Sequence, residues 1–388
     1  MTDRSIAGQM ATRKVNIRFM NKKLFFSNPK EAFRQNIEQF LDVIRQTVWN
    51  GELCDGPEVK SFEKAFAKWC GVSCCSGVDS GTDALFLGMK ALGIGQGDEV
   101  IVPANTFCAT PMAVKYNQAV PVFCDCDANT WEILPCSVER CITQKTKAII
   151  CVHMYGQSCE MEPILQIAKE YDLLVIEDCA QAHGALYRGK KVGGLADLAC
   201  FSFYPTKNLG AGGLAGCVLT EDVSVKEMID HLKSFALDRQ TGDHTQIGYN
   251  MRMDSIQAAL LEYKLQFLDA DNHRRKEIAK AYYDQIHNPR IRFQTVCSVC
   301  DPVWHLFCIA VNDRDRFMAH MQESNIICGI HYPVPCHLQR AFRDLHDSAN
   351  SLPNSEYLSE HCVSIPMYPT MTDEDVARVV DACNRFGG

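Results

Sequence analysis

Two stretches of the sequence decide the fold: LLVIEDCAQAHGA at residues 173–185 and CFSFYPTKNLGAGG at residues 200–213. Each begins as a short apolar run typical of a buried strand; the first reaches Glu177 and Asp178, and the second runs into Lys207 and a glycine-rich turn. Ligands of α/β sheets bind beyond the carboxyl ends of the strands, so these charged side chains are expected at a binding cleft. A lysine near a buried carboxylate suits a Schiff-base pocket, although a structural Asp–Lys ion pair fits the spacing equally well.

Strand-like and helix-like segments alternate around these two stretches. Apolar runs predict strands at Glu99–Val102, Val120–Cys124, Ala148–His153, Leu173–Glu177, Leu198–Phe203 and Ala215–Leu219. Apolar residues at helical spacing predict helices within 31–48 and 58–69 and at Asp83–Leu92, Met161–Tyr171 and Val225–Phe235. This alternation is typical of an α/β fold with a largely parallel sheet and helices on both faces.

The character of the chain changes after a long helical pattern. Residues Asp254 to Ile286 contain no Pro or Gly and predict one continuous helix. Beyond it we expect a smaller α+β domain, with strand Leu306–Val311, helix Asp313–Ser324, strand Ile326–His331 and a closing helix Asp373–Arg385. The predicted division is a large domain at 20–270, a small C-terminal domain at 271–388 and an N-terminal extension at 1–19.

Composition restricts the function classes. The chain has 388 residues and a formal net charge of −8, which argues against nucleic-acid binding as its main role. No apolar stretch approaches the roughly 18 residues of a membrane helix, so no membrane association is expected. Its 21 cysteines often lie inside apolar runs, which indicates reduced thiols and a cytoplasmic location. Cys297 and Cys300 form a lone C-x-x-C pair, and since zinc sites ask for four ligands, no metal is expected.

A helix start upstream is a candidate anion site. Ser80 is a good N-cap, and Gly81 and Thr82 fall in the first helical turn, where free backbone N–H groups attract phosphate. Alone this signal is weak, because most such starts are plain caps. The segment Cys75–Gly81 also lacks the three spaced glycines of a dinucleotide fingerprint, which disfavours an oxidoreductase.

Seven segments, in order along residues 20–385, carry a family resemblance: SGTDAL (80–85), PANTFCAT (103–110), HMYGQ (153–157), EDCAQAHGA (177–185), FSFYPTKNLGA (201–211), YNMRMDSIQAALL (249–261) and IHYPVPCH (330–337). Together they resemble the DegT/DnrJ/StrS-type nucleotide-sugar aminotransferases, which use pyridoxal 5′-phosphate (PLP). The resemblance implies the aspartate-aminotransferase-like fold (fold type I): a large domain with a mixed, mostly parallel sheet and a small α+β C-terminal domain.

The resemblance also implies roles for single residues. Lys207 resembles the lysine that carries the cofactor and then moves protons as acid and base, and Asp178 the carboxylate that keeps the pyridine nitrogen protonated. Gln181 resembles the residue at the phenolic oxygen of the ring, and Phe107 the aromatic side chain that stacks on its face. Phosphate contacts are implied for Gly81, Thr82, Ser202 and, from the neighbouring subunit, Asn250. The last role implies a homodimer with shared active sites.

Substrate contacts are implied less firmly. His331 and Tyr332 begin a motif that in the family lies by the sugar nucleotide, but a strand end that docks the small domain explains them equally well. Arg252 is a plausible diphosphate partner or, equally, an interface partner of Asp254. The same ambiguity holds for Tyr155 and Gln157 at the expected pocket mouth. For His183 we expect packing near the ring rather than a substrate contact.

The sequence departs from the family pattern at one point of the site. Many members carry a Gly-Asp-Gly-Gly cluster after the lysine loop, whereas here Leu214 stands in Gly213-Leu214-Ala215-Gly216. Any substrate or interface contact that the acidic residue makes elsewhere is therefore in doubt here.

The function that follows from the resemblance is transfer of an amino group from L-glutamate to a keto sugar on a nucleoside diphosphate. The segments around Lys207 and Gln181 look more like those of enzymes that act on dTDP-3-keto-6-deoxyhexoses, which would give a dTDP-3-amino-3,6-dideoxyhexose. Alternatives are a 4-keto sugar nucleotide, a ketone without a nucleotide, and a non-catalytic PLP-binding regulator. A PLP-dependent sugar dehydratase is disfavoured, because those enzymes carry His where this chain has Lys207.

Overall fold

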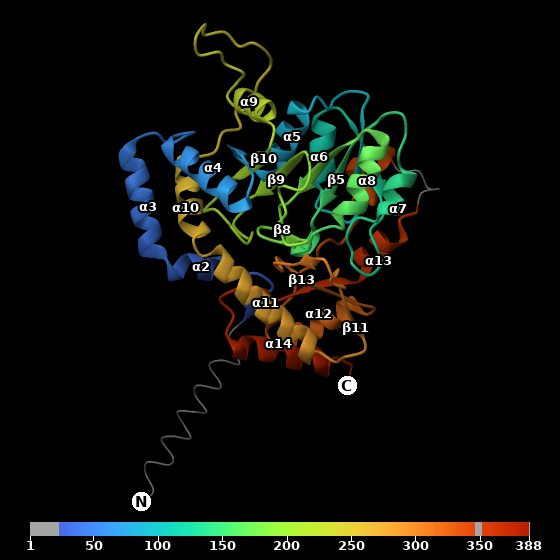
Figure 1. The fold of residues 1–388 in the computed structure, drawn as a ribbon. Coiled ribbons are helices and arrows are strands. Elements are labelled where there is room, and N and C mark those ends of the chain that lie inside the picture. The colour runs from blue at the N-terminus through green and yellow to red at the C-terminus, as the bar shows by residue number, and fades with distance from the viewer. Residues whose placement is uncertain (1–22, 346–350, 388) are drawn as a thin grey trace, which may run out of the picture.

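The structure, a computed structural model, describes residues 23–345 and 351–387 (Figure 1). The expected N-terminal extension at 1–19 lies outside the described residues. No helix within the described ranges is long and apolar enough to cross a membrane.

A twisted sheet forms the centre of the large domain (Figure 1). Its seven strands in the described chain follow the order β2-β10-β9-β6-β5-β3-β4. They are β2 (Cys74–Val78), β3 (Glu99–Pro103), β4 (Val120–Cys124), β5 (Thr146–Val152), β6 (Leu174–Asp178), β9 (Leu198–Ser202) and β10 (Gly216–Thr220). Strand β10 is antiparallel to β2 and β9, and the other neighbours are parallel. The sheet is therefore mixed and mostly parallel, as the sequence predicts.

Helices cover both faces of this sheet. They are α4 (Pro57–Cys70), α5 (Gly81–Ala91), α6 (Ala109–Tyr116), α7 (Pro135–Arg140), α8 (Met161–Tyr171), α9 (Val223–Leu232) and α10 (Ser255–Leu265), with a short 3-10 turn η1 at Met154–Gly156. Helices α2 (Pro29–Gln35) and α3 (Ile37–Asn50) lie outside this layer, where α3 packs on α10. Since successive strand residues point to opposite faces, Ile150 packs in the core under α5 and α6, while Ile149 and Cys151 pack in the core under α8. Burial on both faces explains why the strands read as continuous apolar runs.

The C-terminal part of the chain forms a second core below the large domain (Figure 1). The sheet β11 (Ile291–Phe293), β13 (Phe307–Val311) and β15 (Cys362–Ile365) packs with α11 (Leu268–Gln285), α12 (Arg314–Glu323) and α14 (Asp373–Arg385). Shorter elements complete the described chain: β1 (Leu24–Phe25), β7 (Leu186–Tyr187), β8 (Lys190–Lys191), β12 (Cys300–Asp301), β14 (Ile326–Ile327), α13 (Pro353–His361), η2 (Cys336–Leu338) and η3 (Arg340–Leu345).

The continuous helix expected over Asp254–Ile286 is wrong. The chain forms α10 and α11 and turns between them at Gln266–Phe267, where the Phe267 N–H bonds the Lys264 carbonyl three residues back. The two helices serve different cores, because α10 packs on α3 and α4 while α11 packs on α14. The helical segment therefore breaks because its two halves pack in different cores, and the break involves no Pro or Gly.

Two strands also differ from expectation. Strand β2 was not predicted, because Cys74–Val78 reads CCSGV and lacks the β-branched residues typical of strands. The strand expected at Ile326–His331 ends at Ile327. It pairs with β1, so Leu24 and Phe25 join the small domain's elements rather than the large sheet.

Candidate active site

A cavity of about 520 Å³ opens where β6 and β9 end and α5 begins. Its walls bring together residues that are distant in the sequence. Of the residues predicted for the site, the cavity is lined by Gly81, Thr82, Phe107, Asp178, Gln181, Ser202, Lys207, His331 and Tyr332.

Asp178 ends β6 and lies at the buried side of the cavity, only 5% exposed. Thr110 Oγ1 donates a hydrogen bond to Asp178 Oδ2 at 2.8 Å, and the Ala180 N–H donates to Oδ1 at 3.1 Å. Burial raises the pKa of Asp178 above its ordinary value, while these two hydrogen bonds and the nearby Lys207 oppose that shift. The carboxylate is thus held as an acceptor that faces the cavity.

Lys207 follows β9 in the turn that begins at Tyr204, where its N–H bonds the Tyr204 carbonyl at 2.8 Å. Its side chain is partly exposed to the cavity and otherwise surrounded by protein. Burial lowers the pKa of Lys207 to about 8, and the charge of Asp178 opposes the shift. The neutral amine, which is the nucleophilic form, therefore forms closer to neutral pH than in an ordinary lysine.

The N-terminus of α5 forms a cradle for an anion. The amides of Gly81 and Thr82 lie in the first turn, which leaves them without intrahelical acceptors, and both residues line the cavity. A Cβ at Gly81 would stand 2.5 Å from Ser202 Cβ, so only glycine lets α5 approach β9 this closely. The hydroxyls of Thr82 and Ser202 are at the same wall. Free amides, hydroxyls and the helix dipole together suit a phosphate group.

Gln181 is held in one orientation by its neighbours. Its Oε1 accepts the Tyr155 N–H at 2.8 Å, and its Nε2 donates to the Tyr332 hydroxyl at 3.3 Å. The Tyr332 ring lies 5.4 Å from that of Phe107, which is 51% exposed at the cavity mouth. These contacts present an amide and two aromatic rings to the cavity.

Tyr155 has a different place from the one expected. The side chain is fully buried and does not line the cavity. Its hydroxyl donates to the His331 carbonyl at 2.7 Å, and its N–H holds Gln181. Gln157 is likewise buried and donates to the Thr130 and Thr295 carbonyls. Tyr155 therefore supports two cavity residues from behind rather than facing a substrate.

Asn250 and Arg252 do not line the cavity of their own chain. Arg252 Nη2 donates to Asn250 Oδ1 at 2.8 Å, and Asn250 is exposed. The segment pairs with Ser234 and Val78 at the edge of the large sheet.

His183 and Leu214 also have clear positions. The His183 ring is fully buried, 5.3 Å from Phe201 and 5.6 Å from Phe203, and burial lowers its pKa to about 3. It packs in the core, as the sequence analysis favours. Leu214 is 61% exposed and does line the cavity, so the family's acidic residue is replaced by an apolar wall.

Several cavity residues were missed by sequence reasoning. Thr110, Thr106, Tyr204 and His305 line the walls, and Thr110 also bonds Asp178. Thr106 and Thr110 belong to the segment PANTFCAT, whose resemblance to the family was the available signal. Nothing in the local sequence around His305 marks it.

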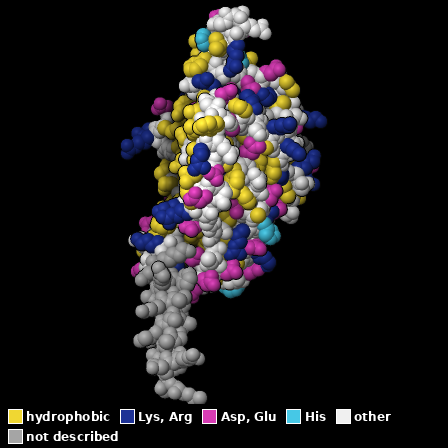
Figure 2. Space-filling view, turned by 90° about the vertical axis from the view of Figure 1, so that its left-hand side faces the viewer, with side chains coloured by type: hydrophobic (Ala, Val, Ile, Leu, Met, Phe, Trp, Pro, Cys, Tyr) yellow, Lys and Arg dark blue, Asp and Glu magenta, His cyan; other side chains and the backbone are white. Residues whose placement is uncertain are grey.

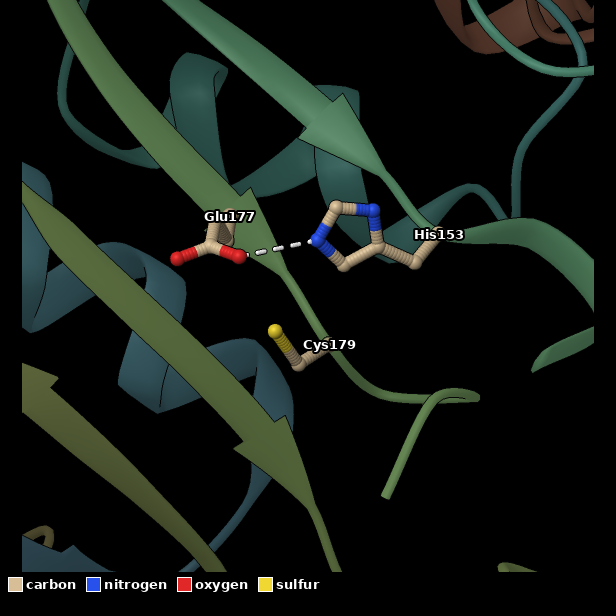
Figure 3. Close-up of side chains that lie close together, drawn as sticks. All are labelled: His153, Glu177 and Cys179. Carbon is tan, nitrogen blue, oxygen red and sulfur yellow. Dashed lines mark hydrogen bonds and ion pairs between the residues drawn. The ribbon is translucent and has the colours of Figure 1, made fainter. Parts of the chain in front are cut away.

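A buried cluster of His153, Glu177 and Cys179 has the residue types of a metal site (Figure 3). His153 Nδ1 accepts the Cys159 N–H at 3.1 Å, so its Nε2 carries the proton and donates to Glu177 at 3.0 Å. Glu177 also accepts the N–H groups of Gly193 and Leu195. The ring nitrogens of His153 and the carboxylate of Glu177 are thereby engaged in hydrogen bonds, and this pair ties β5 and β6 together behind Asp178.

The comparisons with known proteins agree with this geometry. The profile of the DegT/DnrJ/EryC1/StrS aminotransferase family matches residues 34–384. The chain belongs to this family. It is 46% identical over 355 residues to the dTDP-3-amino-3,6-dideoxy-alpha-D-galactopyranose transaminase of Aneurinibacillus thermoaerophilus, covering 92% of this chain and 96% of that protein.

Solved structures show the same fold. The DesV protein of S. venezuelae superimposes with a TM-score of 0.91 at 36% identity, covering 94% of this chain and 98% of that one. The PLP form of a putative sugar aminotransferase, Spr1654 from Streptococcus pneumoniae, gives a TM-score of 0.84 at 25% identity, covering 89% and 95%. The predicted family, fold class, enzyme class and PLP cofactor are therefore confirmed.

Proposed function

We propose that this protein is a PLP-dependent aminotransferase that moves an amino group from L-glutamate to a dTDP-linked 3-keto-6-deoxyhexose. The observation that carries the proposal is the joint placement of Lys207, Asp178 and the α5 cradle around one cavity. Similarity to a dTDP-3-amino-sugar transaminase supports the 3-keto substrate class.

The side chains and amides at this cavity are of the types that suit the cofactor. When bound, PLP supplies a reactive carbonyl carbon and a ring that accepts electrons. The amides of Gly81 and Thr82 and the hydroxyl of Ser202 would hold its phosphate, and Asp178 would keep a proton on the pyridine nitrogen. Gln181, fixed by Tyr155 and Tyr332, would meet the phenolic oxygen.

Lys207 would carry the cofactor and then move the proton. Its lowered pKa lets the amine accept a proton near neutral pH and return it, which is the task of a general acid and base. Phe107 and Tyr332 form an aromatic wall on one side of the cavity, where Phe107 would stack on the cofactor ring. His331 sits at the same wall with Nδ1 bonded to Ser364 Oγ at 2.8 Å.

A homodimer with shared sites is part of the proposal. Apolar side chains are exposed along α3, where Trp49 is 89% and Val48 50% exposed, and on the loop at Ile247, which is 83% exposed. Figure 2 shows hydrophobic side chains gathered over this side of the molecule. Exposed apolar area of this kind marks an interaction surface. Asn250 and Arg252, which are outside their own cavity, are available to a neighbouring one.

The cytoplasm remains the predicted location, supported by the free thiols of all 21 cysteines. L-Glutamate and a nucleotide-linked sugar are the expected small-molecule partners, and neither nucleic acid nor membrane is proposed as a partner.

The test supplies 3-keto and 4-keto dTDP-6-deoxyhexoses separately, each with glutamate, and locates the new amine by NMR. Turnover of the 3-keto sugar with release of 2-oxoglutarate is expected. Turnover of the 4-keto sugar alone would show that the substrate assignment is wrong and that the aminotransferase assignment is right. If no ketone leads to release of 2-oxoglutarate, the result would favour a non-catalytic regulator.

A further inference from the structure

A buried amide network orients the ring of the cavity residue His305. This residue is 7% exposed and lines the same cavity as Lys207. The segment that carries it, Val303–Leu306, is bonded to the loop at Tyr155 and Gly156: the Val303 N–H bonds the Gly156 carbonyl at 2.9 Å and the Leu306 N–H bonds the Tyr155 carbonyl at 3.3 Å. Glycine is required at position 156, because a Cβ there would lie 2.8 Å from the backbone nitrogen of His305.

The network determines which ring nitrogen carries the proton. Asn208 Nδ2 donates to Asn272 Oδ1 at 2.9 Å and to the Val303 carbonyl at 3.0 Å, which fixes the amide so that Oδ1 faces His305. His305 Nδ1 lies 3.2 Å from that oxygen and must donate to it. The Nε2 atom is then an unprotonated acceptor, and it has no partner among the described residues.

Burial and nearby positive charge also keep the His305 ring neutral. Burial lowers the pKa of His305 well below its ordinary value, and the charges of Lys207 and Arg275 lower it further. Arg275 itself is buried and donates to the carbonyls of Trp304 and His305. His183 and His331 add to the same effect. A neutral acceptor with one free lone pair therefore faces a cavity that takes a polyhydroxylated substrate.

We propose that His305 Nε2 accepts a hydrogen bond from a hydroxyl next to the keto carbon of the sugar and so selects which carbonyl faces Lys207. This rests on the proposed function. A 3-keto-6-deoxyhexose has hydroxyls on both carbons that flank the carbonyl, whereas a 4-keto-6-deoxyhexose has one on a single side. An acceptor on the side where the 4-keto sugar has no hydroxyl can thus discriminate between two ring orientations that differ by one carbon.

The experiment uses the holoenzyme in the reverse direction, with 2-oxoglutarate and three amino sugar nucleotides. These are a dTDP-3-amino-3,6-dideoxyhexose and its 2-deoxy and 4-deoxy counterparts. His305→Asn keeps an amide N–H for Asn208 and removes the acceptor at Nε2, while His305→Gln places an amide oxygen at Nε2 and removes the Nδ1 donor. His320→Asn, on α12 outside the cavity, is the matched control.

For His305→Asn we expect kcat/KM for the full amino sugar to fall roughly 3- to 10-fold from the wild-type value, while the half-reaction with glutamate keeps its wild-type rate. For one of the two deoxy sugars, kcat/KM should be the same in His305→Asn as in the wild type. His305→Gln should retain most of the wild-type discrimination. An equal fall with all three sugars would overturn the assignment while leaving the proposed function intact. If the wild-type enzyme turns over none of the three, the proposed function itself fails.

A second measurement needs no variant. In wild-type holoenzyme labelled with ¹⁵N-histidine, the resonance of the unprotonated His305 Nε2 should shift when the full amino sugar nucleotide binds and should stay in place with the deoxy counterpart that lacks the bonded hydroxyl. A protonated Nε2 in the free enzyme would overturn the inference, as would the same shift with all three sugars.

Discussion

The cradle at the start of α5 makes a prediction that can be worked from distances. Gly81→Ala would place its Cβ 2.5 Å from Ser202 Cβ and 3.0 Å from Ser202 Cα, whereas ordinary contact begins at 3.4 Å. The first turn of α5 must therefore move away from β9 by about 0.9 Å. Overpacking of this kind costs about 1–3 kcal/mol of folding free energy. The same movement displaces the amides of Gly81 and Thr82 from a bound phosphate.

The expected effect on the cofactor is larger than the effect on folding. A hydrogen bond to a charged group is worth about 1.5–3 kcal/mol, so misplacing one amide should weaken PLP binding roughly 10- to 100-fold. The assay is an equilibrium titration of apoprotein with PLP, followed by absorbance, together with thermal unfolding with and without PLP. The stabilisation by PLP should shrink in Gly81→Ala, because ligand stabilisation follows the ratio of concentration to Kd.

Gly213→Ala is the matched control. It lies in the glycine-rich turn after Lys207, and outside its chain neighbours its Cβ would meet no atom closer than Gln257 Nε2 at 3.5 Å, so PLP binding should be unchanged. Ser202→Ala removes a hydroxyl from the cradle without a clash and should weaken PLP binding even if Gly81→Ala folds poorly. Wild-type PLP affinity in folded Gly81→Ala and in Ser202→Ala would refute the phosphate assignment.

Three further outcomes are expected. Capture of PLP by the apoprotein should accelerate as pH rises through about 8, because the neutral amine of Lys207 attacks, and borohydride should fix the cofactor to the Lys207 peptide; a pH-independent rate or a label on another lysine would contradict this. Thr110→Val removes a hydrogen bond that lowers the pKa of Asp178. Turnover should therefore fall about 3- to 10-fold, and the acid limb of the pH–rate profile should move to higher pH. An acid limb that does not move would show that Thr110 has no influence on the protonation of Asp178. Mixing inactive Lys207→Ala with an inactive Asn250 variant should restore activity through hybrid dimers, whereas a fully active monomer in light scattering would exclude shared sites.

Much of the large domain could be predicted because its strands are buried on both faces. Apolar runs such as Val120–Cys124 coincide with the strands observed, and Met161–Tyr171 coincides with α8. The placement of Asp178 and Lys207 at one edge follows from a general property of parallel sheets, in which strand ends converge. Here the sequence pattern and the resemblance point to the same residues.

Elements decided by tertiary packing could not be predicted in the same way. The turn at Phe267 depends on two cores that the local sequence does not reveal, and β2 is a strand because β10 pairs with it along its whole length. Local propensity is a weak guide wherever packing overrides it.

The least predictable part of the site is its supporting network, since its partners are far apart in the chain. The bond between His305 and Asn208 spans 97 residues, and that between Tyr155 and His331 spans 176. No sequence spacing specifies such a pair, and the roles of Tyr155 and His305 do not follow from their residue types alone. Tyr155, expected to face substrate, instead holds Gln181 and His331, whereas His305, which no motif marks, faces the cavity. The residues proposed to bind the cofactor are therefore readable from short motifs at strand ends, while His305, proposed to orient the substrate, is placed only by contacts between segments that lie far apart in the chain.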